Sequence, residues 1–293
     1  MEARSATADA EFAGRIAREA GIRLREFRSS FTAGEVERRV AARRLRDAAD
    51  AASQAFLDTE LRAHRPGDAV LSEEAADVSG RDNADFVWII DPLDGTWEYG
   101  LGRDDWAVHI ALWDRRATTP ERLALGVVAI PDADDVYNSA TPPELPPLDL
   151  SRPVRIVTSR TRPPANLDLV AAALVDAWAE LGGPAHADIV RVGSVGAKVA
   201  RLLSGHVEVY LHDSGFYEWD VAAPLAVAQA AGLHASHLDG SPVTFNHRPP
   251  KVTDLLVCRP ELAATALSFF FLMIRRPPTS TLLPYTTLFR STS

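Results

Sequence analysis

The sequence is poor in cysteine and in the residues that mark disordered chains. Cys258 is the single cysteine among 293 residues. One thiol can form neither an internal disulfide nor a cysteine-based zinc site, which favours a reducing cytoplasm. The 17 glycines and 20 prolines together make 37 residues, far below the roughly 25–30% that marks low-complexity chains. A chain of this length can bury a core of its own, as one large domain or two smaller halves.

Long apolar runs are also missing. The longest, Leu267–Ile274, contains a serine, whereas a membrane-spanning helix needs about 20 apolar residues. The amino terminus has no uninterrupted apolar segment of the kind found in secretory signals. We therefore expect a cytoplasmic protein that does not interact with membranes.

Basic side chains are fewer than acidic ones. The chain has 31 basic and 40 acidic side chains, a formal net charge of −9. Proteins that coat nucleic acids carry clusters of lysine and arginine, because these attract the phosphate backbone. A nucleic-acid polymer is therefore not expected as a partner. A small phosphorylated substrate is still compatible with this charge if a cation lies between the acidic side chains and the phosphate.

The pattern of apolar residues indicates a mixed α/β chain. Apolar side chains recur every three or four residues over 12–27 and 45–56, as on one face of a helix. Short apolar runs with β-branched and aromatic residues predict strands, and these lie at 86–90, 106–113, 123–130, 154–157, 189–192, 207–211 and 255–258. Helices are predicted at 167–181 and 221–231. Residues 131–147, rich in aspartate and proline, predict an exposed connection between two subdomains, 1–145 and 146–268.

The last 25 residues, 269–293, break this pattern. Three phenylalanines begin the segment, and a basic, proline-containing and then Ser/Thr-rich stretch without any acidic residue follows. Neither helical nor strand periodicity runs through it. The segment resembles translated sequencing-adapter read-through. We therefore predict that 269–293 is a non-native tail and leave it out of the functional argument.

Two aspartates stand where a buried strand ends. Asp91 follows the apolar run 86–90, and the turn at Pro92 brings Asp94 back toward it. Side chains at the carboxyl ends of strands commonly build the sites of α/β proteins. Two carboxylates so close repel each other unless a cation neutralises them, and oxygen ligands select a hard ion such as Mg²⁺. Gly95 and Thr96 then offer backbone N–H groups for a phosphate oxygen.

Three separated motifs carry a resemblance to a known family: Glu73-Glu74, the run Asp91-Pro-Leu-Asp-Gly-Thr96, and Trp219-Asp-Val-Ala-Ala223. With these the sequence resembles the inositol-monophosphatase-like superfamily of Mg²⁺-dependent, lithium-sensitive phosphatases. Within it, 65–74, 102–113 and 218–224 are most similar to CysQ-type 3′(2′),5′-bisphosphate nucleotidases of actinobacteria. The resemblance covers roughly residues 8–267. It implies a layered α-β-α-β-α sandwich of two subdomains, similar to fructose-bisphosphatase, and leaves a homodimer open.

The resemblance also implies a site for two or three Mg²⁺ ions. The implied ligands are Glu73, Asp91 and the carbonyl of Leu93 for one ion, Asp91, Asp94 and Asp220 for a second, and Asp50 near Glu73 for a third. A water on the metals, oriented by Glu73 and Thr96, would attack phosphorus in line, with Asp94 as a further catalytic residue. The metals would lower the pKa of that water and stabilise the entering and leaving oxygens.

Substrate contacts are expected mainly from the second half of the chain. The candidates are Gly95, Thr96, Ser159, Arg160, Gly193, Ser194, Lys198 and Glu218. A nucleotide with two phosphates needs positive charge for the phosphate that is not hydrolysed, and Arg160 or Lys198 could supply it. Glu98 favours the nucleotidase branch, because inositol phosphatases usually carry asparagine there.

The favoured reaction is hydrolysis of 3′-phosphoadenosine 5′-phosphate, and of its sulfated relative, to release phosphate. Inositol 1-phosphate or fructose 1,6-bisphosphate would need the same chemistry on a different alcohol. A phosphatase with an aspartyl-phosphate intermediate also places Asp-Gly-Thr after a strand, but with one residue between the two acids. Here Pro92 and Leu93 separate Asp91 from Asp94, which disfavours that mechanism. The remaining alternative is an inactive member of the family.

Overall fold

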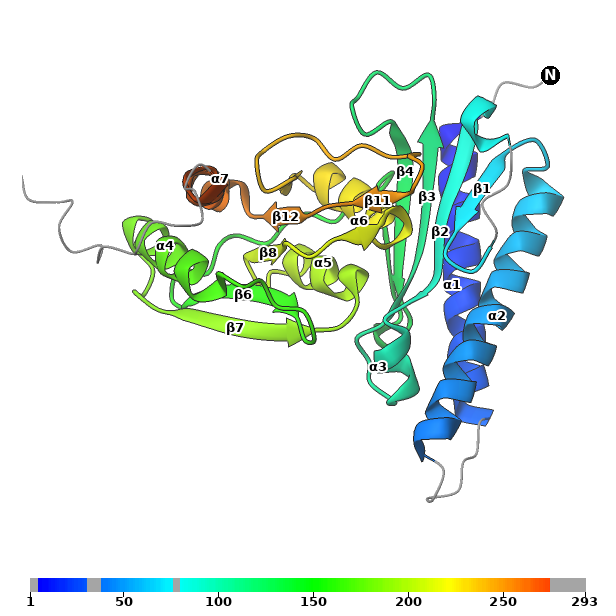
Figure 1. Ribbon diagram of the computed structural model, residues 1–293, viewed down its shortest axis with the longest axis horizontal. Coiled ribbons are helices and arrows are strands. Elements are labelled where there is room, and N and C mark those ends of the chain that lie inside the picture. Colours follow the sequence, from blue (N-terminus) through cyan, green and yellow to red (C-terminus); the bar gives the residue numbers. More distant parts are fainter. Residues whose placement is uncertain (1–4, 31–37, 76–79, 275–293) are drawn as a thin grey trace, which may run out of the picture.

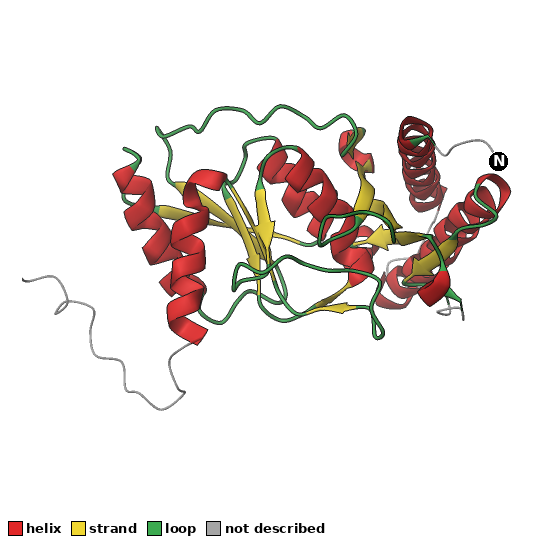
Figure 2. Cartoon of the chain, turned by 90° about the horizontal axis from the view of Figure 1, so that it is seen from above, coloured by secondary structure: helices red, strands yellow, loops and turns green. Residues whose placement is uncertain are grey.

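A computed structural model describes residues 5–30, 38–75 and 80–274 of the chain (Figure 1). These residues form five layers, in the order helices, sheet, helices, sheet, helices. Figure 2 shows the same layers from above, with helices between and outside the strands. The expectation of a layered, mixed α/β fold is confirmed.

The first sheet has five strands in the order β1-β2-β3-β4-β5. Their bounds are β1 Ala69–Ser72, β2 Phe86–Asp94, β3 Ala107–Asp114, β4 Leu123–Ile130 and β5 Asp135–Asn138. β1 is parallel to β2, and the other neighbours are antiparallel. Two long helices, α1 (Ala6–Ser30) and α2 (Arg38–His64), cover its outer face, as expected from their apolar periodicity.

The alternation of side chains along β2 determines on which face of the sheet its last residues lie. Trp88 and Ile90 belong to the core under α1 and α2, whereas Val87 and Ile89 belong to the core on the opposite face. Successive side chains of a strand point to opposite faces. Asp91 therefore continues on the side of Val87 and Ile89, toward the middle layer of helices.

The middle layer is shared by both sheets. It consists of α5 (Val195–Leu203) and α6 (Glu218–Ala230), which pack in one core with residues of the first and the second sheet. The second sheet has the order β10-β12-β8-β6-β7. Its strands are β6 Val154–Ser159, β7 Ala187–Val192, β8 Val209–His212, β10 His234–Ser236 and β12 Leu255–Cys258. β6 is parallel to β7 and to β8.

The outer face of the second sheet is covered by α4 (Leu167–Glu180) and α7 (Pro260–Ile274). The remaining elements are short: α3 Thr96–Gly100, the 3₁₀ turns Arg81–Asn83 and Pro131–Ala133, and a two-stranded ribbon of β9 Phe216–Tyr217 and β11 Lys251–Val252. Among the described residues, none of the helices is long and apolar enough to cross a membrane.

Several elements differ from the sequence-based expectations. Residues 131–147 were expected to be an exposed connection, but β5 lies within them and pairs with β4 as the edge strand of the first sheet. α5 and β1 were not expected. α6 begins at Glu218 rather than at 221, because the Asp220 carboxylate accepts the Tyr217 N–H at 2.8 Å and caps the helix.

The first residues of 269–293, the segment predicted to be a non-native tail, form the end of a helix although no helical periodicity runs through the segment. α7 continues through Phe269 and Phe270 to Ile274. Phe270 is 8% exposed and belongs to the core beneath α4 and α7, together with Trp178 and Leu262. Residues 275–293 lie outside the described residues.

Replacing Phe270 by alanine is therefore expected to lower the free energy of unfolding by about 2–4 kcal/mol, through lost burial and a cavity. Chemical denaturation measures this, with Ser268→Ala on the exposed side of the same helix as the control. A chain ending at Ser268 should likewise be less stable than one ending at Ile274. Equal stability of these two chains would contradict the packing of Phe270.

Candidate active site

Three carboxylates converge where β2 meets the middle layer. Asp91 and Asp94 come from the end of β2, and Asp220 comes from the first turn of α6. One oxygen of each lies within 4.8 Å of the others. Asp91 is 1% exposed. The strand and the helix thus bring together acids that are more than 120 positions apart in the chain.

Without a cation, this arrangement is electrostatically unfavourable. Burial raises the pKa of Asp91 well above its ordinary value, and the charges of Asp94, Glu73 and Asp220 add to the effect. Burial and the neighbouring Asp94 raise the pKa of Asp220 to about 7. A set of close, buried oxygen ligands that repel each other when ionised fits a hard divalent cation. The residues present therefore suit a metal site.

Glu73 and Asp50 extend the acidic cluster. Glu73 directly follows β1, and partial burial of its carboxyl, with the charges of Asp94 and Glu74, raises its pKa to about 7. Asp50 lies on α2, where burial and then the charges of Glu74 and Glu73 raise its pKa to about 8. Glu73 thus lies within electrostatic reach of the cluster, and Asp50 lies within electrostatic reach of Glu73.

Hydrogen bonds from the middle layer hold Asp94. Its Oδ2 accepts the Ser194 hydroxyl at 2.5 Å and the Gly196 N–H at 3.1 Å, both at the start of α5. His109 Nε2, fully buried on β3, lies 3.3 Å from the same oxygen. Ser194, for which a substrate contact was predicted, positions this carboxylate, and the substrate contact stays a prediction. His109 was not predicted, because a lone histidine in an apolar strand gives no such signal.

The turn between the two aspartates is also fixed by hydrogen bonds. The Leu93 N–H donates to Asp91 Oδ1 at 3.0 Å, and the Ser53 hydroxyl donates to the Pro92 carbonyl at 2.9 Å. Gly95 then has φ +87°, a left-handed conformation that favours glycine. It precedes α3, whose first residue is Thr96. These contacts therefore hold the run Asp91-Pro-Leu-Asp-Gly-Thr96 in one defined turn.

Arg160 is engaged in ion pairs. Its guanidinium lies 2.6 Å from Glu98 Oε1 and 2.6 Å from Asp105 Oδ2. Asp105 Oδ2 also accepts the Gly193 N–H at 2.8 Å. A side chain at Gly193 would overlap Glu98, so the close approach requires glycine there. Arg160 thus joins α3, the segment before β3 and the end of β7, and its charge is already compensated.

Lys198 is also engaged. Its ammonium donates to the carbonyls of Gly193 at 2.6 Å and Ser194 at 3.1 Å. The residue is 2% exposed, and burial lowers the pKa of its amine to about 8. Lys198 therefore secures the turn that carries Ser194.

Glu218 and Ser159 have partners within the protein as well. The Glu218 carboxylate is fully buried and accepts the N–H groups of Asn246 and His247, each at 2.7 Å. The hydroxyl of Ser159, a buried residue at the end of β6, accepts the Arg162 N–H at 3.2 Å.

The comparison with known proteins agrees with this geometry. Residues 7–267 match the description "Inositol monophosphatase family". The chain belongs to the inositol monophosphatase family.

Three relatives of this chain have names that state an enzymatic activity. A protein of Mycobacterium bovis named 3′-phosphoadenosine 5′-phosphate phosphatase is 44% identical over 231 residues, which cover 76% of this chain and 80% of the relative. A protein of the same name from Mycobacterium leprae is 40% identical over 271 residues, or 88% and 92% of the two chains. The Escherichia coli 3′(2′),5′-bisphosphate nucleotidase CysQ is 30% identical, covering 69% and 79%.

Solved structures share the fold of the inositol monophosphatase family. The inositol monophosphatase of Anabaena superposes with a TM-score of 0.64 at 22% identity, covering 93% of this chain and 98% of that chain. A 2′AMP-bound structure of SaIMPase-II gives a TM-score of 0.67 at 20% identity, covering 91% and 95%.

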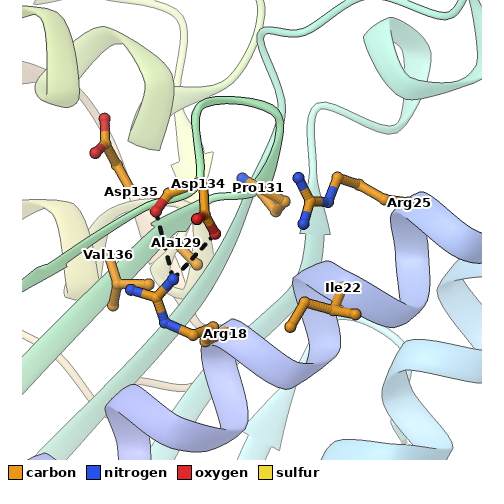
Figure 3. A pocket seen from close by; sticks show the side chains of 8 residues that line it. All are labelled: Arg18, Ile22, Arg25, Ala129, Pro131, Asp134, Asp135 and Val136. Atoms are coloured by element: carbon orange, nitrogen blue, oxygen red, sulfur yellow. Dashed lines mark hydrogen bonds and ion pairs between the residues drawn. The ribbon is translucent and has the colours of Figure 1, made fainter.

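Two cavities of this protein lie away from the acidic cluster. Figure 3 shows one between α1 and the segment 129–136, where Arg18 donates to the Asp134 carboxylate at 3.0 Å. A larger cavity of about 370 Å³ lies among 104–105, 130–137 and 197–206. Neither is lined by a residue predicted for the site.

Proposed function

We propose that this chain is a Mg²⁺-dependent phosphomonoesterase that hydrolyses the 3′-phosphate of 3′-phosphoadenosine 5′-phosphate, giving AMP and phosphate. The convergence of Asp91, Asp94 and Asp220 carries the proposal, because it supplies the oxygen ligands for a cation beside the signature turn. The names of relatives at 40–44% identity support the choice of substrate. The buried single thiol of Cys258 is compatible with a reducing cytoplasm.

The proposed metal ligands are those of the acidic cluster: Glu73, Asp91, Asp94, Asp220 and the carbonyl of Leu93, with Asp50 beside Glu73 for a further ion. When bound, Mg²⁺ supplies positive charge that neutralises the phosphate and makes water a stronger nucleophile at neutral pH.

The chain's own residues position the reacting groups. Ser194 and Gly196 hold Asp94, and the Leu93 N–H holds Asp91, so the carboxylates cannot turn away from the site. We assign to Glu73, together with Thr96, the orientation of the attacking water, and to the Glu73 carboxylate the acceptance of one proton from it. The oxygen of that water bonds to phosphorus, the bond from phosphorus to O3′ breaks, and O3′ takes up a proton from solvent.

A phosphate-release assay tests this function. With Mg²⁺ present, we expect kcat/KM for 3′-phosphoadenosine 5′-phosphate to exceed that for inositol 1-phosphate and fructose 1,6-bisphosphate by at least about tenfold, since recognition of a second phosphate and a base adds binding energy. Chelation of the metal should abolish release, and Mg²⁺ should restore it. A higher kcat/KM for inositol 1-phosphate would contradict the substrate, and full turnover in chelator would contradict the mechanism.

A further inference from the structure

His109 is a buried polar residue in an otherwise apolar stretch of β3. Val108 and Ile110 belong to the core under α1 and α2, and Ala107 and Ala111 belong to the core on the other face. His109 is fully buried, and among the described residues its Nε2 has no partner aligned for a hydrogen bond. A buried polar atom of this kind costs free energy. An apolar side chain would be more favourable in this strand, so the imidazole points to a function.

The strand register places His109 beside the acidic cluster. It lies opposite Asp91 in the antiparallel pair of β2 and β3. Residues directly opposite each other on neighbouring strands have their side chains on the same face of the sheet. The imidazole therefore faces the middle layer of helices, as Asp91 does.

The ring lies between the two elements that carry the other aspartates of the cluster. Its Nε2 is 3.3 Å from Asp94 Oδ2 at the end of β2. Its Nδ1 is 3.3 Å from the Trp219 carbonyl oxygen in the first turn of α6, and Trp219 directly precedes Asp220. One rigid ring thus contacts a carboxylate of the first element and the backbone of the second, which limits how far apart the two elements can lie.

Close packing by α5 holds the ring in place. A Cβ at Gly196 would lie 2.3 Å from His109 Nε2, so the first turn of α5 lies directly against the imidazole. The Gly196 N–H also donates to Asp94 Oδ2 at 3.1 Å. The same glycine therefore contacts both the ring and the carboxylate beside it.

We propose that His109 is a positioning residue that holds Asp94 and Asp220 at the spacing needed to bind a divalent cation. It acts through these two aspartates and touches neither the substrate nor the ion. Loss of a group that orients metal ligands typically lowers metal affinity or activity roughly 10- to 100-fold. The inference rests on the proposed function and adds a residue to the same site.

The test measures metal binding without catalysis. Mg²⁺ is titrated by calorimetry into substrate-free wild type, His109→Leu and His109→Gln. Leucine is close to histidine in size but has no polar atom, so we expect its Kd for Mg²⁺ to rise about 10- to 100-fold. Glutamine supplies an amide N–H that can reach Asp94, and it should recover part of the affinity. In chelator, the melting temperature of His109→Leu should be at least that of the wild type, because a buried polar atom without an aligned partner is removed.

Phosphate release from 3′-phosphoadenosine 5′-phosphate gives a second readout. His109→Leu should need about 10- to 100-fold more Mg²⁺ for half-maximal rate. At saturating Mg²⁺, its kcat and its KM for the substrate should stay within about threefold of the wild-type values, since the residue contacts neither reacting group. A histidine that only fills the core would leave the Mg²⁺ requirement unchanged.

Thr158→Val is the matched control. Thr158 is fully buried on β6, and its hydroxyl likewise has no hydrogen-bond partner among the described residues. It follows Val157, which belongs to the core of the middle layer, so its side chain lies on the opposite face of the second sheet. This variant should keep the wild-type affinity for Mg²⁺.

An unchanged Kd for Mg²⁺ in His109→Leu, or an equal rise in Thr158→Val, would overturn the inference. A strong loss of stability in metal-free His109→Leu would also overturn it, because the histidine would then serve the core. Wild-type protein that binds Mg²⁺ but does not hydrolyse the bisphosphate would instead refute the proposed function. The calorimetric comparison would still decide the role of His109 in that case.

Discussion

Replacing Asp94 by asparagine is expected to abolish phosphate release, with kcat/KM reduced on the order of 10³-fold or more. Asp94 lies among the converging carboxylates, and its Oδ2 accepts hydrogen bonds from Ser194 and Gly196. Asparagine is nearly the same size and could keep one of these contacts, but it removes the negative charge that a cation needs. The loss should therefore come from chemistry and metal affinity rather than from unfolding.

The control is Asp47→Asn, which removes an exposed carboxylate that pairs with Arg43 on α2. This variant should retain wild-type kcat/KM. Circular dichroism of Asp94→Asn should match that of the wild type. Retention of more than a tenth of the activity in Asp94→Asn would show that this carboxylate is not part of the catalytic site.

Asp91→Asn is expected to give opposite effects on activity and stability. Activity should fall to a similar extent, whereas the metal-free protein should become more stable by about 1–3 kcal/mol at pH 8. The reason is that Asp91 is buried near Asp94, Glu73 and Asp220, so its charge is unfavourable when no cation is bound. The amide oxygen of asparagine can still accept the Leu93 N–H.

The raised pKa values of these carboxyls determine how the stability of the metal-free protein changes with pH. The pKa of Asp220 is raised from 3.8 to about 7 in the folded protein, and burial raises that of Asp91 well above its ordinary value. At these two carboxyls the folded state then binds more protons than the unfolded chain, so in metal-free wild type their contribution to stability should be largest near pH 4 and be lost as the pH rises through 7. Asp91→Asn should show a smaller loss.

Thermal denaturation in chelator, at pH values from 4 to 8, measures both effects. Addition of Mg²⁺ at pH 8 should raise the melting temperature of the wild type more than that of Asp91→Asn, because a ligand that binds only the folded state stabilises it. A lower melting temperature for metal-free Asp91→Asn at pH 8 would contradict the repulsion among these carboxylates.

The central part of the site could be predicted because it is local in sequence. The apolar run 86–90 identifies the strand, and the spacing of Asp91 and Asp94 places both acids at one turn. The alternation of β2 then explains why Asp91 faces the middle layer. Asp220 could be added only through the resemblance to a family, since nothing in its local sequence indicates the distant strand.

The partners of the basic residues could not be predicted. Arg160 meets acids 62 and 55 positions earlier in the chain. Local patterns determine which element an arginine follows, but not which acids the tertiary fold places beside it. Sequence reasoning therefore treated Arg160 and Lys198 as available charges, whereas the structure uses both to hold a turn. His109 was missed for the same reason, because its neighbour Asp94 comes from the adjacent strand.

The near absence of lysine has a practical consequence. Lys198 is buried and Lys251 is exposed, so these two side-chain amines differ sharply in their access to reagents. An amine-reactive fluorophore should label the Lys251 side chain and leave that of Lys198 unmodified in the folded protein. The dye would sit next to Tyr217, whose N–H donates to the Asp220 carboxylate. Its emission could then report occupation of the site in a single-turnover experiment, without any engineered cysteine.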